Sequence, residues 1–176
     1  MLAFYHIKTN SRHKATLEAE VLDFFQSAIA NKSDLINFCL QVLAIFLQLE
    51  PQMNEKYRSI YHSLLDPDNW KEENQSVMSS YIQFIIAYLS RERSSLIADR
   101  PAIEVILSKV IEIDHIELFF RFLEAIMLNT TLQEFNQSGY MGIFISGSQA
   151  IGQSIQGKKA TLLFTSKLIL QYGNAQ

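Results

Sequence analysis

One stretch near the end of the chain nearly matches a phosphate-binding loop. Gly152-Gln-Ser-Ile-Gln-Gly157-Lys158-Lys159 approaches the pattern GxxxxGK[ST], and an apolar run, residues 141–145, precedes it as a strand would. However, Lys159 stands where a Ser or Thr hydroxyl would bind magnesium, and no second strand ending in Asp follows. The other interpretation is a turn between two helices, with Gly157 ending the first and the two lysines beginning the second. We favour the turn, and we expect no nucleotide or other cofactor.

The remaining reactive side chains form no catalytic or metal-binding pattern. His6, His13, His62 and His115 lack the spacing of metal ligands. The carboxylates are typical of solvated helix faces, and nothing distinguishes a catalytic pair. Cys39 is the single cysteine, which excludes an internal disulfide, and it lies on an apolar helix side where a buried thiol is expected. We therefore predict no catalytic residue, no metal site and no enzymatic activity.

Composition restricts the class of protein further. The chain has 176 residues, 48% of them hydrophobic and 19% charged, with a formal net charge of −3. These values are typical of a globular protein with a sizeable core. The slight acidity argues against nucleic-acid binding. The apolar runs are shorter than a bilayer is thick and no secretory signal begins the chain, so membrane insertion is not expected.

The stretch from Ser33 to Glu50 indicates the kind of element that builds the fold. Ser33 can cap a helix, and Pro51 must end it. Its polar side chains fall on one narrow stripe of the helix: Asp34, Asn37, Gln41 and Gln48. All other sides are apolar, so the helix needs apolar neighbours on both flanks and behind it. This pattern predicts one member of a layer of helices.

Helices of this kind recur in pairs along the chain. The predicted pairs cover residues 13–50, 54–91, 94–128 and 138–173, a period of about 40 residues that is typical of HEAT or armadillo arrays. The second helix of each pair is the more apolar, which suits the inner layer of a solenoid. We predict an all-α fold, an α-solenoid of about four HEAT-like antiparallel helix hairpins. Residues 1–176 would form a single segment of a longer superhelix; a compact helical bundle is the alternative.

Single residues mark the expected ends and junctions of these helices. Asn54 and Asp114 are suited to cap helix N-termini, and Pro101 is acceptable in a first turn. Trp70, shortly after Pro67, is expected to fill a junction between helices rather than to bind a ligand.

Two segments resemble a known family. Residues 17–50, a phenylalanine-rich helix followed by DLINFCLQVLAIFLQLE, look like consecutive helices of the importin-α re-exporter family of exportins, also called the cellular apoptosis susceptibility (CAS) family. The next segment, YRSIYHSLLDPDNW, is similar to that family's helix ending in Leu-Leu, then Pro, then Trp. Residues 77–91 resemble the helix that follows in the family.

The resemblance runs from about Val21 to Gly173 and weakens after Leu128. Three glycines, Gly142, Gly147 and Gly152, replace bulkier or charged family residues there. Each glycine inside a helix costs up to about 1 kcal/mol relative to alanine, so we expect this region to be bent or locally loose.

The resemblance implies a HEAT superhelix that carries importin-α out of the nucleus together with RanGTP and shuttles between nucleus and cytoplasm. The chain would come from the C-terminal half of such a receptor. A different HEAT or armadillo-type interaction scaffold without Ran dependence is the alternative. The resemblance assigns no contact residue, so the candidates come from the polar strips of the inner helices. The alternative is that these polar residues are merely solvated and contact no partner. They are Asp34, Asn37, Gln41, Ser79, Gln83, Glu117, Arg121 and Glu124.

Overall fold

The computed structural model describes residues 11–30, 35–49, 53–71 and 74–173. Within these ranges every regular element is a helix, and no strand occurs. The elements are α2 (Ser11–Ala30), α3 (Leu35–Leu49), α4 (Glu55–Leu64), the 3-10 helix η1 (Pro67–Trp70), α5 (Gln75–Leu89), α6 (Ser95–Ala98), α7 (Arg100–Glu112), α8 (Ile116–Leu128), α9 (Leu132–Gln137), α10 (Tyr140–Ile151) and α11 (Ile155–Gly173).

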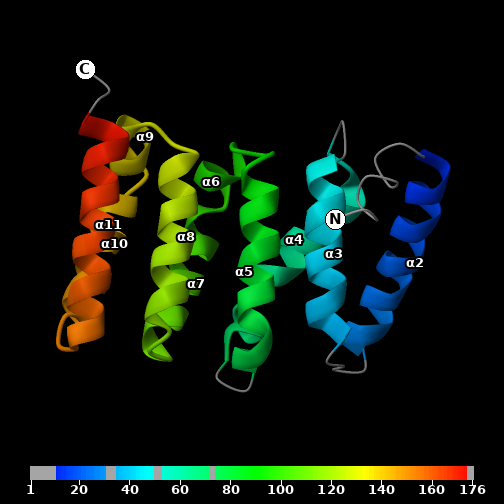
Figure 1. The fold of residues 1–176 in the computed structure, drawn as a ribbon, viewed down its shortest axis with the longest axis horizontal. Helices are drawn as coiled ribbons and strands as arrows, with labels where there is room; N and C mark the ends of the chain where they lie inside the picture. Colours follow the sequence, from blue (N-terminus) through cyan, green and yellow to red (C-terminus); the bar gives the residue numbers. More distant parts are fainter. Residues whose placement is uncertain (1–10, 31–34, 50–52, 72–73, 174–176) are drawn as a thin grey trace.

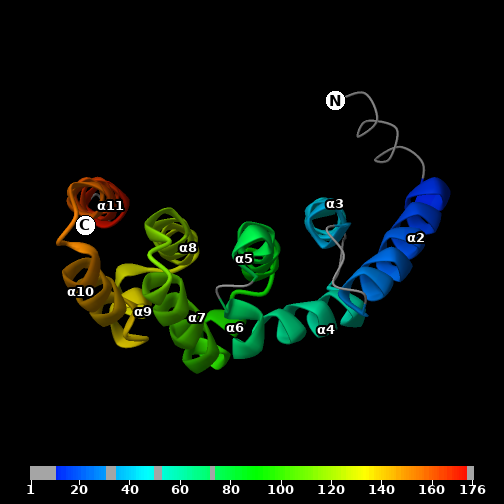
Figure 2. The same cartoon turned by 90° about the horizontal axis from the view of Figure 1, so that it is seen from below.

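The helices form two layers that follow an arc (Figures 1 and 2). Figure 2 shows α3, α5, α8 and α11 side by side along the concave side, with the remaining helices along the convex side. Each inner helix pairs with an outer helix that precedes it in the chain. The predicted α-solenoid of four helix hairpins is therefore confirmed, and the compact bundle is excluded.

The apolar pattern of the inner helices explains why they occupy this layer. In α5, buried side chains occur on nearly every side of the helix, from Met78 to Leu89. In α8, Phe119 and Phe122 are fully buried. A helix with so little polar surface is stable only between neighbours, so stacking in a continuous row is the arrangement that hides its apolar sides.

Tyrosine hydroxyls connect one hairpin to the next. Tyr61 on α4 donates to Asp99 (3.0 Å), and Tyr140 on α10 donates to the carbonyl of Leu96 (2.6 Å). Burial, followed by the charge of Asp99, raises the pKa of Tyr61 well above its ordinary value, so the hydroxyl stays a donor. These bonds join residues about one repeat apart in sequence.

The junction between α4 and α5 is filled by Trp70, as predicted. Its ring is fully buried, packs edge-on against Tyr81 at 5.8 Å between centroids, and donates its indole N–H to the carbonyl of Leu64 (2.8 Å). Asn54 caps α4 by accepting the N–H of Lys56 (3.0 Å), which is also as predicted.

Asp114 does not cap α8, contrary to the prediction. It adopts a left-handed conformation with φ of 56° and ends α7, while His115 is the residue that precedes α8. The N–H of His115 reaches the carbonyl of Val110 (2.9 Å), and that of Asp114 reaches Ile111 (2.9 Å). These two bonds form a Schellman motif, in which Asp tolerates the left-handed position better than most side chains do.

In the glycine-rich region, which we expected to be bent or locally loose, Gly142 and Gly147 lie within one helix and Gly152 follows its end. Helix α10 is continuous from Tyr140 to Ile151 and begins after Gly139, whose φ is 79°. Gly147 is buried, and a Cβ atom there would run into the side chains of Phe119 and Ile111. The glycine therefore lets α10 approach α7 and α8 closely, and this contact compensates for its low helix propensity.

Candidate functional site

The phosphate-loop candidate is a connection between two helices. Residues 141–145 lie in α10 rather than in a strand, so the scaffold of a nucleotide loop is missing there. Gly157 lies inside the first turn of α11 and does not end a helix, contrary to our prediction. Its N–H donates to Ser154 Oγ (2.9 Å), and an added Cβ would collide with the carbonyl of Ile151. Close packing of this connection explains the glycine, and both Lys158 and Lys159 are exposed.

Other chemistry receives no support from the part of the chain that the structure describes. It contains no group of three or more His, Cys, Asp or Glu side chains placed to hold a metal ion. Cys39 is 2% exposed, and burial raises the pKa of its thiol, which makes it a poor nucleophile. His6 lies outside the described residues. Among the described helices, none combines the length and apolar character that crossing a bilayer requires.

The predicted polar strips lie on α3, α5 and α8 of the inner layer, and Asp34 falls outside the described residues. On α3, Gln41 is exposed, whereas Asn37 donates its amide to the carbonyl of Ser76 (3.4 Å) and so joins α3 to α5. On α5, Ser79 is exposed and Gln83 is half-buried. The structure thus gives Asn37 a contact within the fold.

Ser80, the residue after Ser79 on α5, is buried and does not belong to the strip. It is only 4% exposed. A serine hydroxyl is small enough to be accommodated inside a helix layer, so residue type alone did not show on which side of the strip it lies.

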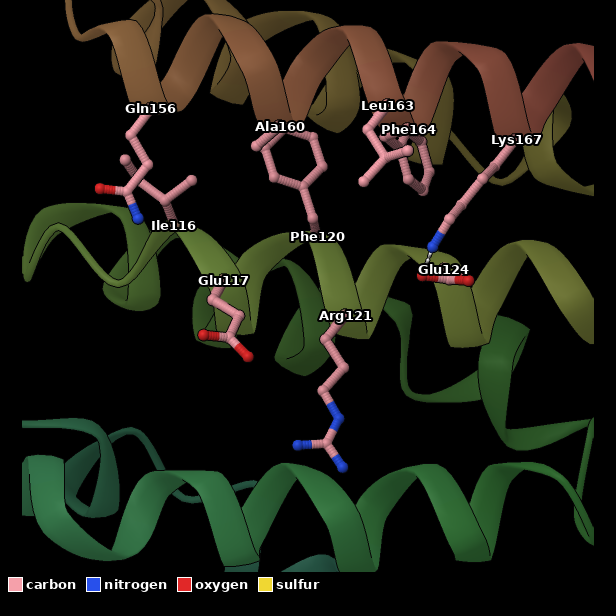
Figure 3. A pocket seen from close by; sticks show the side chains of 10 residues that line it. All are labelled: Ile116, Glu117, Phe120, Arg121, Glu124, Gln156, Ala160, Leu163, Phe164 and Lys167. Carbon is pink, nitrogen blue, oxygen red and sulfur yellow. Dashed lines mark hydrogen bonds and ion pairs between the residues drawn. The ribbon is translucent and has the colours of Figure 1, made fainter.

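The strip on α8 is the most strongly charged of the three. Lys167 of α11 donates to Glu124 (2.6 Å), and this ion pair joins the two inner helices (Figure 3). Glu117 and Arg121 are both exposed, and Figure 3 shows both side chains directed away from α11, toward the neighbouring helix on the other side. Sequence reasoning missed Lys167, whose role depends on a contact across 43 residues.

Two grooves lie on either side of the α8 strip. The α8–α11 groove has a volume of about 400 Å³ and contains apolar rings and side chains between the two helices (Figure 3). Its apolar members are Ile116, Phe120, Ala160, Leu163 and Phe164. The groove on the other side, here called the central groove, has a volume of about 430 Å³ and lies between α3, α5 and α8.

The lining of the central groove is partly apolar and partly polar, and we call these two sets of residues its floor and its rim. The floor residues are Ala44, Ile45, Ile86, Ala87, Ala125 and Leu128. The rim residues are Gln48, Gln83, Ser90, Arg121 and Glu124. Sequence reasoning found three of these rim residues as candidate sites but missed the floor. The available signal was one alanine in the second half of each of α3, α5 and α8, at Ala44, Ala87 and Ala125.

The arrangement provides an extended surface for binding a macromolecule. Apolar depressions bordered by a few charged and amide groups are typical of protein interaction surfaces. A model of the family described as CAS/CSE protein, C-terminus, matches residues 3–168.

The chain belongs to the CAS/CSE family.

The CAS/CSE family consists of nuclear transport receptors of the exportin type rather than enzymes. The match begins before α2 and ends within α11, so it includes all three inner helices that border the central groove. No curated protein and no solved structure matches the chain. In this CAS/CSE chain the concave side, with its two grooves and the charged strip of α8 between them, is the candidate site.

Proposed function

We propose that this protein takes part in exporting importin-α from the nucleus, in a complex that requires RanGTP, and that it shuttles between nucleus and cytoplasm. The observation that carries the proposal is the family match over residues 3–168. The solenoid supports it, because a curved array of helices offers a partner a long concave surface.

The concave side is the part of the chain that we propose for partner contact. Gln41, Ser79, Glu117 and Arg121 are exposed on three successive inner helices, where one partner could contact all of them. Such a surface binds through many modest contacts, and a few central ones dominate the free energy of binding. Removing any single rim residue therefore weakens binding without abolishing it, whereas filling a groove removes several contacts at once.

The test measures retention of the protein on beads that carry importin-α. Ran is added in its GTP-loaded form in one sample and in its GDP-loaded form in another, at equal concentration. We expect retention with the GTP form alone. A matched pair of variants distinguishes the two sides of the array: Ala125→Arg fills the central groove, and Ser108→Arg adds the same side chain on the outer helix α7, where Ser108 is exposed.

The proposal requires loss of retention for Ala125→Arg and unchanged retention for Ser108→Arg, with both variants showing unchanged helicity by circular dichroism. Equal retention with RanGDP contradicts the Ran-dependent export function and favours a scaffold that holds its partner without Ran. Equal retention of the two arginine variants contradicts the assignment of the concave side.

A further inference from the structure

Arg121 is a cation at the rim of the central groove that is paired with none of the carboxylates that the structure describes. No ion pair within 4.0 Å joins it to an acidic side chain of the described residues. Glu124, one turn further along α8, is already paired with Lys167 on the opposite side of the helix. Figure 3 shows the Arg121 guanidinium directed away from that pair and Glu117 not bridged to it.

The other helices bordering the groove do not neutralise this charge. The side chains that they contribute to the rim, Gln48 of α3 and Gln83 and Ser90 near α5, are neutral. Glu124, the one carboxylate among the described residues that line the groove, is paired with Lys167, so the guanidinium of Arg121 is the charge that this lining leaves for a partner.

The apolar floor of the groove determines which apolar side chains a partner must have. Leu128 is 56% exposed and lies seven residues after Arg121 on the same helix, a separation of about 10 Å along its axis. The apolar lining also includes Ala87 and Ala125, whose small side chains leave room for a bulky side chain of a partner. A second helix lying along the groove would match this spacing with a carboxylate and an apolar residue seven positions apart.

We propose that the central groove binds an amphipathic helix of a partner protein whose carboxylate pairs with Arg121 and whose apolar side chains cover the alanine floor and Leu128. Charge complementarity selects this occupant over a basic helix, because no ion pair within the described part of the chain occupies Arg121. The proposal rests on the concave side being the partner side, as in the proposed function. It requires neither importin-α nor Ran.

The probe is a fluorescein-labelled synthetic helical peptide of 16 residues in alanine and glutamine. It carries one Glu, with Leu at three, four and seven positions after it, so that all four side chains share one face. A second peptide has Lys in place of the Glu, and a third has Ala in place of the last Leu. Fluorescence anisotropy measures the affinity of the whole chain and its variants for each peptide.

We expect the Glu peptide to bind about tenfold more tightly than the Lys peptide, as a charge-assisted hydrogen bond warrants. Arg121→Glu should reverse this preference, and Leu128→Ala should make the last Leu position unimportant, so that the first and third peptides bind alike. Lys158→Glu is the matched control, because it makes the same charge change at an exposed residue of α11 that does not line the groove. It should leave the preference unchanged.

Three outcomes overturn the proposal: no saturable binding of the Glu peptide, equal binding of the Glu and Lys peptides, or a preference that survives Arg121→Glu in a variant with unchanged circular dichroism. Failure of the importin-α retention test with success here would leave the groove as the docking site of a different partner. If the importin-α retention test succeeds but the Glu peptide does not bind, the export function stands and the proposed helix-binding role of the central groove is wrong.

Discussion

At the scale of single residues, two glycines of α10 differ in how much space surrounds them. Gly147 is buried where an added Cβ would meet Phe119 and Ile111, whereas nothing lies within 4 Å of the corresponding position at Gly142. We predict that Gly147→Ala lowers the free energy of unfolding by about 1–3 kcal/mol, because the overpacked side chains must move. Urea denaturation followed by far-UV circular dichroism measures the change.

Gly142→Ala on the same helix is the matched control. It is exposed, and alanine restricts the unfolded chain more than glycine does, so a gain of about 0.4–1 kcal/mol is expected. Equal effects of the two substitutions would mean that helix propensity, and not the contact with α7 and α8, determines the cost at Gly147.

The ring of Trp70 and its hydrogen bond make separable contributions to stability. Trp70→Ala removes a fully buried ring, so a loss of about 3–5 kcal/mol is expected. Trp70→Phe keeps an aromatic ring but leaves the carbonyl of Leu64 without its donor, and we expect a loss of about 1–3 kcal/mol. Trp70 is the single tryptophan, so unfolding is followed by circular dichroism rather than by tryptophan fluorescence. Equal losses for the two variants would contradict a packing role for the ring.

At the scale of elements, the short helix α9 depends on its capping box. The N–H and the hydroxyl of Thr131 donate to Glu134 (2.8 and 2.9 Å), and the Thr131 hydroxyl accepts the N–H of Glu134 (3.2 Å). The backbone bond and then the hydroxyl bond lower the pKa of Glu134 below its ordinary value of 4.5. The carboxylate therefore stabilises the folded state above pH 4.5, and this contribution is lost as the pH falls through the lowered pKa.

We predict that Glu134→Gln is less stable than the unmodified protein at pH 7, and that the difference narrows as the pH is lowered below 4.5. Urea denaturation of both proteins at a series of pH values measures this. Thr131→Ala should cost about 1 kcal/mol at pH 7, since it removes one side of the box. A difference between the proteins that does not depend on pH would show that the charge of Glu134 is not involved.

The sequence predicts the elements here better than it predicts their joints. The apolar period of α3, α5 and α8 was sufficient to assign the helix pairs, since a helix with one polar strip has few places to lie. Helix α9 was not predicted because its single buried anchor, Phe135, gives no periodicity over six residues. The tyrosine bonds, such as Tyr140 to Leu96, were also missed, because a tyrosine in an apolar stripe has the same pattern whether or not its hydroxyl finds a partner.

The candidate site was predictable to a similar extent. The polar strips could be read from spacing within one helix. The pairing of Glu124 with Lys167, by contrast, requires knowing which helices are neighbours and how far one is shifted along the other. Predicting the central groove also requires knowing which helices are neighbours, because side chains of three helices make its floor.

At the scale of the whole molecule, stability should vary along the array. Helix α5 has inner-layer neighbours on both sides and buries nine residues, from Met78 to Leu89. Helix α11 has one inner-layer neighbour in this chain and buries three residues, Gly157, Phe164 and Leu168. In a solenoid each repeat is stabilised by its neighbours alone, so the helix with fewer buried residues opens at a lower free energy.

We predict that native-state hydrogen exchange is slowest in α5 and α8 and faster by at least about tenfold in α11. Mass spectrometry of peptides after deuterium labelling measures the exchange of each helix. Uniform protection across α5, α8 and α11 would indicate that the array opens only as one cooperative unit, which a neighbour-by-neighbour architecture does not favour.

The buried thiol of Cys39 gives the chain a built-in reporter. No other cysteine competes with it, and both its 2% exposure and its raised pKa suppress reaction with maleimides while α3 is packed. Maleimide dye at neutral pH should therefore label only the molecules in which α3 has locally unpacked. We expect the labelling rate to rise with urea concentration well below the denaturation midpoint. The buried thiol would in this way report the local opening of the repeat in which it lies.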